Sequence, residues 1–234
     1  MKLFKLPKFN IWSALVDLII VILGILIAFT LNTWWINRQN QSIERDLLMN
    51  LRDEVKLDKS EIELVINRID SIRLSAEQLL SFVGPDAEEM PADKFWQFLK
   101  PCLGKMTYDG TNTVQSSIVN NGDIRLIKNL DIQYQLALLP SKLNDYLEDE
   151  EFTENALDLH LRPYVLSNFP TYSMDKRPGH FKVSTIKALR DPAFDSYLGR
   201  IYYRQGRLRV EILDYRSHLT QLVELIEAEL VILN

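Results

Sequence analysis

The chain is poor in the residues that build covalent and catalytic sites. It has one cysteine, Cys102, so it forms no internal disulfide and no cysteine-rich metal site. Its three histidines lie far apart in the sequence and share no metal-ligand spacing. It contains no phosphate loop, dinucleotide fingerprint, nucleophile elbow or HExxH motif. The sequence therefore predicts no cofactor, no metal and no catalytic activity, although an active site assembled only by folding stays open.

Glycine is also scarce, at 8 of 234 residues, and charge of one sign does not dominate, with 27 basic against 32 acidic residues. The basic residues form no stripe, which argues against nucleic acid as a partner. We find no period-two alternation long enough for a convincing strand. This composition suits long helices more than sheets, and the predicted fold class is all-α.

What the sequence does contain is one long apolar run near its N-terminus. Residues 18–31 are apolar or small at every position except Thr30, and tryptophans flank the run at Trp12, Trp34 and Trp35. The distance from Trp12 to Trp34 corresponds to about 33 Å of helix at ~1.5 Å per residue, close to a hydrocarbon core of roughly 30 Å. We therefore predict a single transmembrane helix with the three tryptophans as interfacial anchors in the lipid bilayer.

This run divides the chain into a cytoplasmic tail at 1–10, a transmembrane helix at 11–35 and a helical domain at 36–234. Three lysines and the α-amino group precede the run, whereas the three arginines that follow it are interspersed with acids. The positive-inside rule then places the N-terminus inside, by a slight bias. A cleaved signal peptide is the alternative, but the run is long for one and lacks a small-x-small cleavage pattern. We expect an anchored protein with an extracytoplasmic domain.

Two seams of residues at alternating spacings of three and four predict two long helices. The first occupies 38–83 and continues the transmembrane helix. Its one charged position, Asp58, would weaken the seam or open it to water or a partner, and Leu57 could take over part of the contact. The second follows Asp191-Pro192, a helix start with an N-cap acid and a first-turn proline. The seam residues are Leu48, Leu51, Val55, Asp58, Ile62, Val65, Ile69, Ile72, Ala76, Leu79 and Val83, then Leu198, Ile201, Gln205, Leu208, Ile212, Tyr215, Leu219, Leu222 and Ile226.

The simplest packing of these two helices is antiparallel, in an elongated bundle that shorter helices close at the distal end. The segments 91–99, 111–120, 130–150 and 152–168 predict the shorter helices, and 169–183 predicts a loop. Pro140 is expected to kink or split its helix, and the helix at 152–168 to be interrupted near Pro163. The buried face expected for 130–150 comprises Ile132, Leu136, Leu139, Leu143 and Leu147.

The apolar run contains a recognisable pattern, Asp17-x6-Gly24-Ile25-Leu26-Ile27-Ala28-x3-Asn32-x-Trp34. It resembles the N-terminal span of an uncharacterised bacterial family of single-pass membrane proteins, in which Glu usually stands where this chain has Asp17. Residues 116–129 and Asp191-Pro192-x-Phe194 resemble later elements of that family, so the likeness covers most of the chain. The resemblance implies an anchored helical domain and no established activity.

Asp17 is the sharpest candidate for function, because an ionisable group inside a bilayer is costly. It shares one helix face with small residues, and a small-xxx-small pair allows close helix approach. The alternative is that Asp17 lies close enough to Trp12 to reach water or headgroups. The predicted helix-packing face is Ala14, Asp17, Val21, Gly24 and Ala28.

A second candidate is the polar element around Asn121-Gly122. Arg125 and Lys128 could hold a partner's anionic group beside the helix that Asn129 caps. The alternative interpretation is a helix-turn-helix corner whose polar groups satisfy the backbone.

Two functions follow from these features. The first is a non-enzymatic interaction module, either an accessory subunit of a membrane complex or a homo-oligomer. The second is a single-span sensor whose bundle binds a small ligand and passes a shift along the continuous helix. A ten-residue tail leaves the sensor without an output domain, so it would need a partner span.

Overall fold

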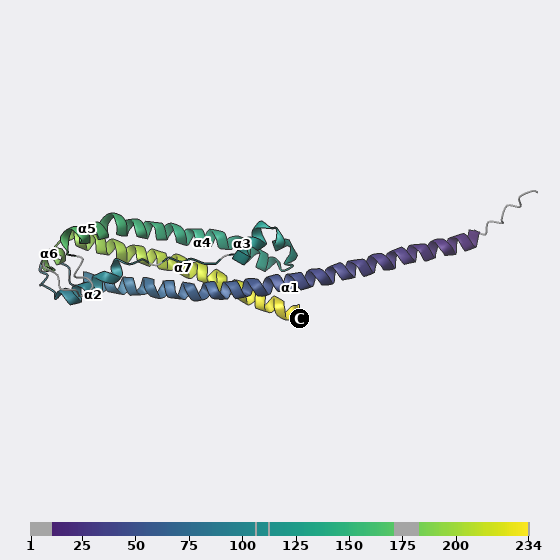
Figure 1. Cartoon of the computed structure of the whole chain (residues 1–234), viewed down its shortest axis with the longest axis horizontal. Helices are drawn as coiled ribbons and strands as arrows, with labels where there is room; N and C mark the ends of the chain where they lie inside the picture. The colour runs from purple at the N-terminus through teal and green to yellow at the C-terminus, as the bar shows by residue number, and fades with distance from the viewer. Residues whose placement is uncertain (1–10, 106, 112, 171–182, 234) are drawn as a thin grey trace, which may run out of the picture.

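The computed structural model describes residues 11–105, 107–111, 113–170 and 183–233, and within these ranges the chain is helical with no strand. The predicted all-α fold is confirmed. Three long helices form an elongated bundle, from which the first part of α1 projects alone (Figure 1). In chain order the helices are α1 (Ile11–Leu80), α2 (Ala92–Cys102), α3 (Thr113–Asn120), the 3₁₀ helix η1 (Asp123–Leu126), α4 (Leu130–Ala156), the π-helical turn η2 (Leu157–Leu161), α5 (Arg162–Asn168), α6 (Ile186–Leu189) and α7 (Pro192–Ile232).

Helix α1 is unbroken over 70 residues, or about 105 Å at ~1.5 Å per residue. The predicted seam is confirmed, since its members from Leu48 to Leu79 are all buried, Asp58 included. Val83 lies beyond the helix end and is half-buried. Leu57 is 63% exposed, so the expectation that it shares the seam contact is wrong. It lies about 100° around the helix from Asp58, which turns it to the outside.

Helix α7 begins as predicted, with the Asp191 side chain accepting a hydrogen bond from the Ala193 N–H at 2.9 Å. Its seam is buried at every predicted position from Leu198 to Ile226. Ion pairs show that α7 runs antiparallel to α1, because the residue number falls on one helix as it rises on the other. The pairs are Lys56–Glu227 at 2.6 Å, Glu63–Arg216 at 2.7 Å and Asp70–Arg209 at 2.6 Å.

The third long helix differs from its prediction in three ways. Pro140 does not split α4, because Leu139 and Tyr146 on either side of it are fully buried and their packing holds the helix together. No new helix starts at residue 152; instead α4 continues into the π turn and α5, and that turn stands just before Pro163. Leu147 is 40% exposed rather than buried, and Tyr146 replaces it inside. Because an α-helix has 3.6 residues per turn, successive steps of four residues rotate around the helix axis. Leu147, two such steps after Leu139, has therefore rotated out of the buried face.

The interior consists of two apolar clusters along the bundle. The cluster nearer the projecting part of α1 joins the seams of α1 and α7 to the first half of α4. The distal cluster centres on Phe95, whose ring lies 5.1 Å from that of Phe169 and 5.9 Å from that of Phe194. Burying each such ring contributes roughly 1.5–3 kcal/mol. The loop predicted at 169–183 lies mostly outside the described residues.

A segment without helical structure joins α2 to α3 along the bundle, and we call its described residues, 103–105 and 107–111, the strap. A Cβ at Gly104 would meet the Arg68 side chain, and the Thr111 N–H bonds to Asp58. The strap therefore descends along α1 from the distal end. It fills the groove that three helices leave open.

Candidate interaction face and buried strap contacts

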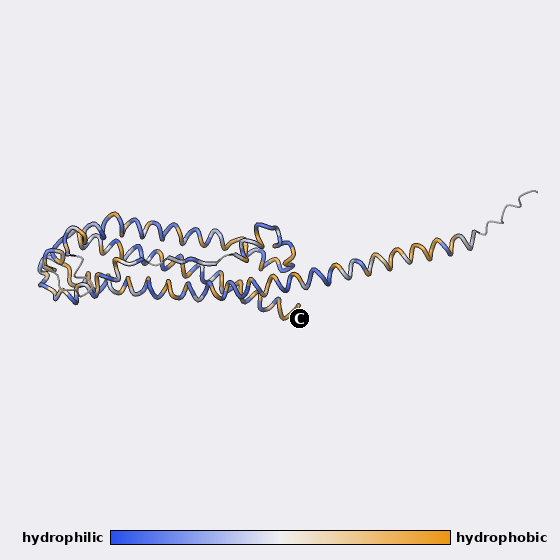
Figure 2. The backbone as a smooth tube through the Cα atoms, in the orientation of Figure 1, coloured by the Kyte–Doolittle hydropathy of each residue, from blue (hydrophilic) through white to orange (hydrophobic). Residues whose placement is uncertain are grey.

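The projecting part of α1 carries the predicted span. It includes a window of mean hydropathy 2.6 that is uncovered by the rest of the chain, so α1 is long and apolar enough to cross a membrane. Figure 2 shows the contrast between this apolar rod and the mixed colouring of the bundle. Every described side chain from residue 15 to residue 39 is exposed, and the first buried one is Glu44. The span thus contributes nothing to the chain's own packing.

The predicted packing face lies open on this rod. Asp17 is exposed and forms no hydrogen bond or ion pair with any residue the structure describes. A Cβ placed on Gly24 would meet nothing within 4 Å. Val21 and Ala28 are exposed beside them, whereas the side chain of Ala14 lies outside the described part. Another helix could therefore approach this face closely.

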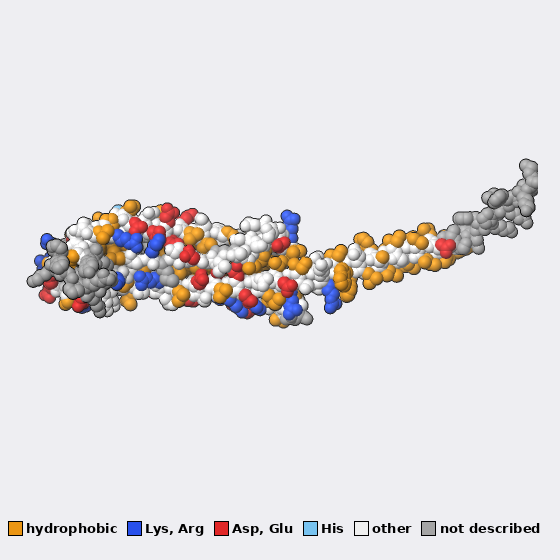
Figure 3. Space-filling view, in the orientation of Figure 1, with side chains coloured by type: hydrophobic (Ala, Val, Ile, Leu, Met, Phe, Trp, Pro, Cys, Tyr) orange, Lys and Arg blue, Asp and Glu red, His pale blue; other side chains and the backbone are white. Residues whose placement is uncertain are grey.

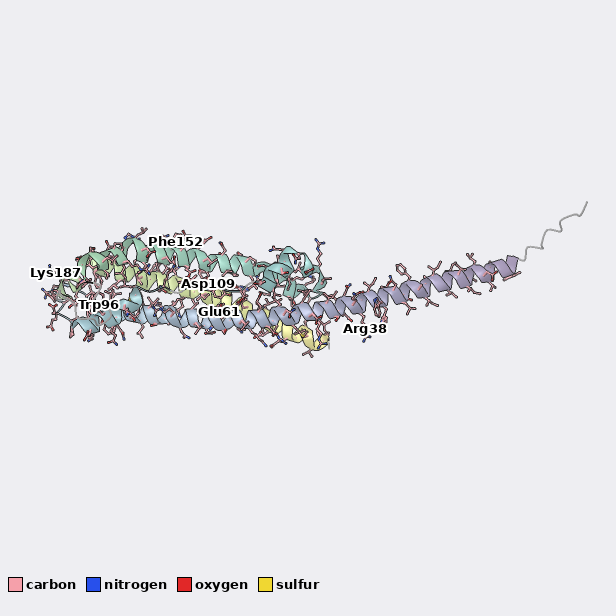
Figure 4. The ribbon with its side chains drawn as sticks, viewed as in Figure 1. Arg38, Glu61, Trp96, Asp109, Phe152 and Lys187 are labelled. Atoms are coloured by element: carbon pink, nitrogen blue, oxygen red, sulfur yellow. The ribbon has the colours of Figure 1, made fainter. Side chains whose placement is uncertain are left out.

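The three tryptophans are exposed at the two ends of the span, Trp12 at 78%, Trp34 at 56% and Trp35 at 65%. The Arg38 guanidinium lies 5.6 Å from the centre of the Trp34 ring, a cation–π distance. Arg38 stands on the projecting rod between the bundle and the span (Figure 4). This placement is the one that interfacial anchors require, and their role as anchors stays a prediction.

The uncovered face continues from the span into the bundle. At about 100° per residue, Leu57 and Leu64 lie within about 40° of Asp17 around the axis of α1, whereas Val55 and Ile62 of the seam lie about 160–180° away. Leu57 is 63% and Leu64 is 60% exposed, whereas Val55 and Ile62 are buried. We call Asp17, Gly24, Ala28, Leu57 and Leu64 the outer face. One helix thus packs its own bundle on one side and leaves the other side free.

The second predicted site lies where the bundle meets the projecting rod. The Asn129 side chain accepts from the Asp131 and Ile132 N–H groups, which confirms the predicted cap of α4. Its amide nitrogen donates to Glu229 at 2.8 Å. The Lys128 N–H donates to Glu44 at 2.6 Å, and its ammonium lies 3.7 Å from the same carboxylate.

The other two members of that site behave differently. Asn121 donates to the neighbouring Ser117 hydroxyl at 3.0 Å, and Arg125 is exposed. Gly122 has φ +79°, a left-handed conformation that only glycine adopts without strain. The element is therefore a turn whose polar groups already contact the chain's own backbone and carboxylates, and the four residues do not converge on a shared pocket.

Three buried carboxylates of α1 hold the strap and the elements after it. Sequence reasoning placed Asp58 in the seam, but it missed the burial of Glu44 and Glu54 and the hydrogen bonds of all three. The Glu54 carboxylate accepts from the Val114 N–H at 2.7 Å and the Gln115 N–H at 3.0 Å, so it caps the first turn of α3. Asp58 accepts from the Thr111 N–H at 3.1 Å, and Glu44 holds Lys128 as described. These acids are 0–7% exposed. The available signal was their three- and four-residue spacing from the apolar seam.

An aromatic residue of the strap, Tyr108, is also buried in the core of the bundle. The Tyr108 ring packs edge-on against the rings of Tyr146 at 6.4 Å and Tyr215 at 5.8 Å. Burial raises the pKa of all three phenols, that of Tyr215 to about 12, so they stay neutral. Burial also raises the pKa of the nearby Asp58, partly offset by its hydrogen bond from the Thr111 N–H.

A small cavity lined by both apolar and polar side chains lies under the start of the strap. It has a volume of about 20 Å³, room for roughly one water. Glu150 Oε1 and Gln205 Oε1 are buried there and bond to no described residue. Burial, and then repulsion by Glu154, raises the pKa of Glu150 to about 7, although Thr107 and Lys105 of the strap lower it.

Among the described residues, no three His, Cys, Asp or Glu side chains come together in a way that could hold a metal. Cys102 is buried, and burial raises the pKa of its thiol to about 12, as for a core residue. A comparison of the chain with family models, curated proteins and solved structures finds no match. The family resemblance of the span therefore rests on the residue pattern alone.

Proposed function

We propose that this chain is a membrane-anchored, non-enzymatic interaction subunit that binds a second membrane protein through the outer face of α1. Its place would be a bacterial inner membrane, with the N-terminus inside and the bundle in the periplasm. The lysines of the 1–10 tail support this orientation by the positive-inside rule.

One observation supports the proposal. The seam of α1 is buried inside its own bundle, whereas the residues on the opposite face of α1 are exposed in the described chain. The long seams of α1 and α7 therefore pack against each other within one chain. What remains for a partner is the outer face, which includes an intramembrane carboxyl. A carboxyl inside a bilayer is costly unless another group pairs with it.

The charges on that face favour a different chain over a second copy. By the same rotation, Asp46 also lies within about 20° of Asp17 around α1 and has no ion pair with any described residue, whereas the nearby Asp53 pairs with Arg52 at 2.7 Å. Two parallel copies anchored at equal depth would bring each acid against its own counterpart, and like charges repel. A partner helix with a basic residue near the level of Asp17 would instead form a charge-assisted hydrogen bond.

The test is purification of the tagged full-length protein from native membranes in mild detergent, followed by native mass spectrometry. We expect a stoichiometric second protein, and at least a tenfold loss of it when Gly24→Ile or Asp17→Leu is introduced. Leu26→Phe is the matched control, because it adds bulk about 180° from this face. Equal capture by all variants would overturn the proposal, and a pure homo-oligomer would replace the partner by a second copy.

A sensor is the second candidate, and the unbroken 70-residue α1 favours it. A helix without a break can pass a shift or rotation from the bundle to the span. A ligand of the bundle would have to change the accessibility of the span, measured as cysteine labelling at Ala28→Cys in nanodiscs. Labelling that stays unchanged when the bundle is saturated with a ligand would remove this candidate.

A further inference from the structure

An open groove of about 210 Å³ lies between α4–η2 and α7 near the distal end of the bundle. One wall is apolar and comes from Phe152, Ala156 and Leu159. Phe152 is 52% and Leu159 is 67% exposed, so this wall presents apolar surface to the groove. Figure 4 places Phe152 on the outer side of α4, away from the bundle interior.

The opposite wall is basic. Arg200 and Arg204 stand one turn apart on α7, and no acidic residue lines the groove. The Arg204 guanidinium lies 5.1 Å from the Phe152 ring, and Arg200 has no ion pair with any residue the structure describes. Figure 3 shows basic, acidic and apolar side chains interspersed over the distal half of the bundle, so the lack of an acid in the groove is local. In a chain of net charge −5, such a groove is locally cationic.

The helix itself is distorted at this place. The π turn Leu157–Leu161 presents Leu159 and His160 to the groove, and it precedes Pro163, whose ring would clash with the Leu159 carbonyl in a regular helix. The His160 ring is fixed by stacking on Tyr197 at 5.5 Å. Single π turns occur frequently at functional sites. The groove is thus lined by a histidine that stacks on α7 and by two arginines whose guanidinium groups could turn toward a ligand.

We propose that this groove binds a small organic oxyanion, a carboxylate or phosphate monoester that carries an aromatic or aliphatic group. Arg200 and Arg204 would hold the oxyanion, because their planar forks match carboxylate and phosphate oxygens. Phe152 and Leu159 would cover the apolar part. The volume is below the roughly 300–1,000 Å³ of sites for drug-sized ligands, so the ligand holds one ring or a short chain. This site is independent of the proposed partner face, which lies on α1.

The experiment titrates full-length protein in nanodiscs with four probes by calorimetry: 4-phenylbutyrate, phenyl phosphate, the neutral 4-phenylbutanamide and inorganic phosphate. We expect saturable binding of one or both organic anions, at least tenfold tighter than that of the neutral amide. Charge-assisted hydrogen bonds of this kind are each worth roughly a tenfold or larger change in affinity. The stronger of the two anions identifies the oxyanion.

Variants then locate the binding. Arg200→Gln and Arg204→Gln should each weaken it by about tenfold. Arg207→Gln is the matched control, since Arg207 lies on the same helix and pairs with Asp149 and Glu211 outside the groove. Arg200 is exposed, and an unchanged melting temperature would show that the variant folds. Equal binding of the amide, equal loss in the Arg207 control, or no saturation by either organic anion up to 10 mM would each overturn the proposal.

Discussion

The two halves of α1 form one unbroken helix, but the first half is exposed and the second half packs against the bundle. Residues 15–39 are all exposed, whereas from Glu44 onward the helix buries a regular seam against α4, α7 and the strap. An isolated helix is marginal in water, so the second half depends on packing. The first half has no such support, but a bilayer stabilises a helix by leaving its backbone no other hydrogen-bond partners. The buried seam therefore lies wholly beyond the predicted span, which ends at residue 35, since Glu44 is the first buried residue of the helix.

The largest expected effect on stability separates the buried seam of α1 from its exposed outer face, within the half of the helix that packs on the bundle. Ile62 is fully buried in the seam, and Leu64 is 60% exposed on the outer face. We expect Ile62→Ala to lower the free energy of unfolding by about 2–5 kcal/mol, and Leu64→Ala to change it by about 0.5 kcal/mol or less. Denaturant unfolding followed by circular dichroism measures both. Similar losses would mean that the outer face is covered within the chain.

The next test concerns the buried carboxylates beside the seam of α1. Glu54 holds two N–H groups of α3, and Glu61 on the same helix is exposed. Removing the carboxylate in Glu54→Ala leaves both donors unbonded, and we expect a loss of about 1–3 kcal/mol. Amide exchange at Val114 and Gln115 should accelerate. Glu61→Ala is the control, and an equal effect there would contradict the anchoring role.

A third test uses pH. The folded pKa of Glu150 is raised to about 7 from an ordinary 4.5, so the fold disfavours its ionised form. The resulting penalty is absent below pH 4.5, grows as the pH rises through 7 and stays constant above it. Glu150→Gln should therefore stabilise the protein by about 1–2 kcal/mol at pH 8 and have little effect at pH 4.5. Thermal melts of both proteins across this range measure the difference, and a pH-independent difference would refute the assignment.

The smallest expected changes in stability come from replacing two glycines that lie outside α1. Gly122 has φ +79°, whereas Gly199 lies within α7 with open space around its Cβ position. Gly122→Ala should destabilise the protein by about 1 kcal/mol, because a side chain is strained in the left-handed region. Gly199→Ala should stabilise it by up to about 1 kcal/mol through helix propensity. The same melts measure both, and effects of one sign would show that conformation does not decide them.

Much of the fold could be predicted, because each seam is a local repeat that a single helix carries. The helix start at Asp191, the cap at Asn129 and the tryptophan-flanked span also depend only on neighbours in the sequence. Leu57 and Leu147 were placed wrongly, since rotation around a helix of fixed pitch, rather than apolar character, decides which side chains face inward.

The predicted packing face of the span is open in the structure, and the predicted polar element forms a turn. The strap contacts and the groove could not be predicted, because they join residues far apart in the chain. Glu54 lies 61 positions from Gln115, and Glu44 lies 84 positions from Lys128. From the sequence, a carboxylate on a helix is expected to be solvated. Its burial is predictable only when the distant backbone N–H groups that bond to it in the folded chain are known.

By itself the sequence determined the helices, the apolar rod and the antiparallel pair, because hydrophobic periodicity acts over a few residues and fixes which face is buried. Only the tertiary structure decided which acids lie inside, how the strap packs on the bundle and that Arg200, Arg204 and Phe152 line one groove. The reason is physical: burial makes a charge costly unless a distant part of the chain bonds to it, and that bond exists only after folding.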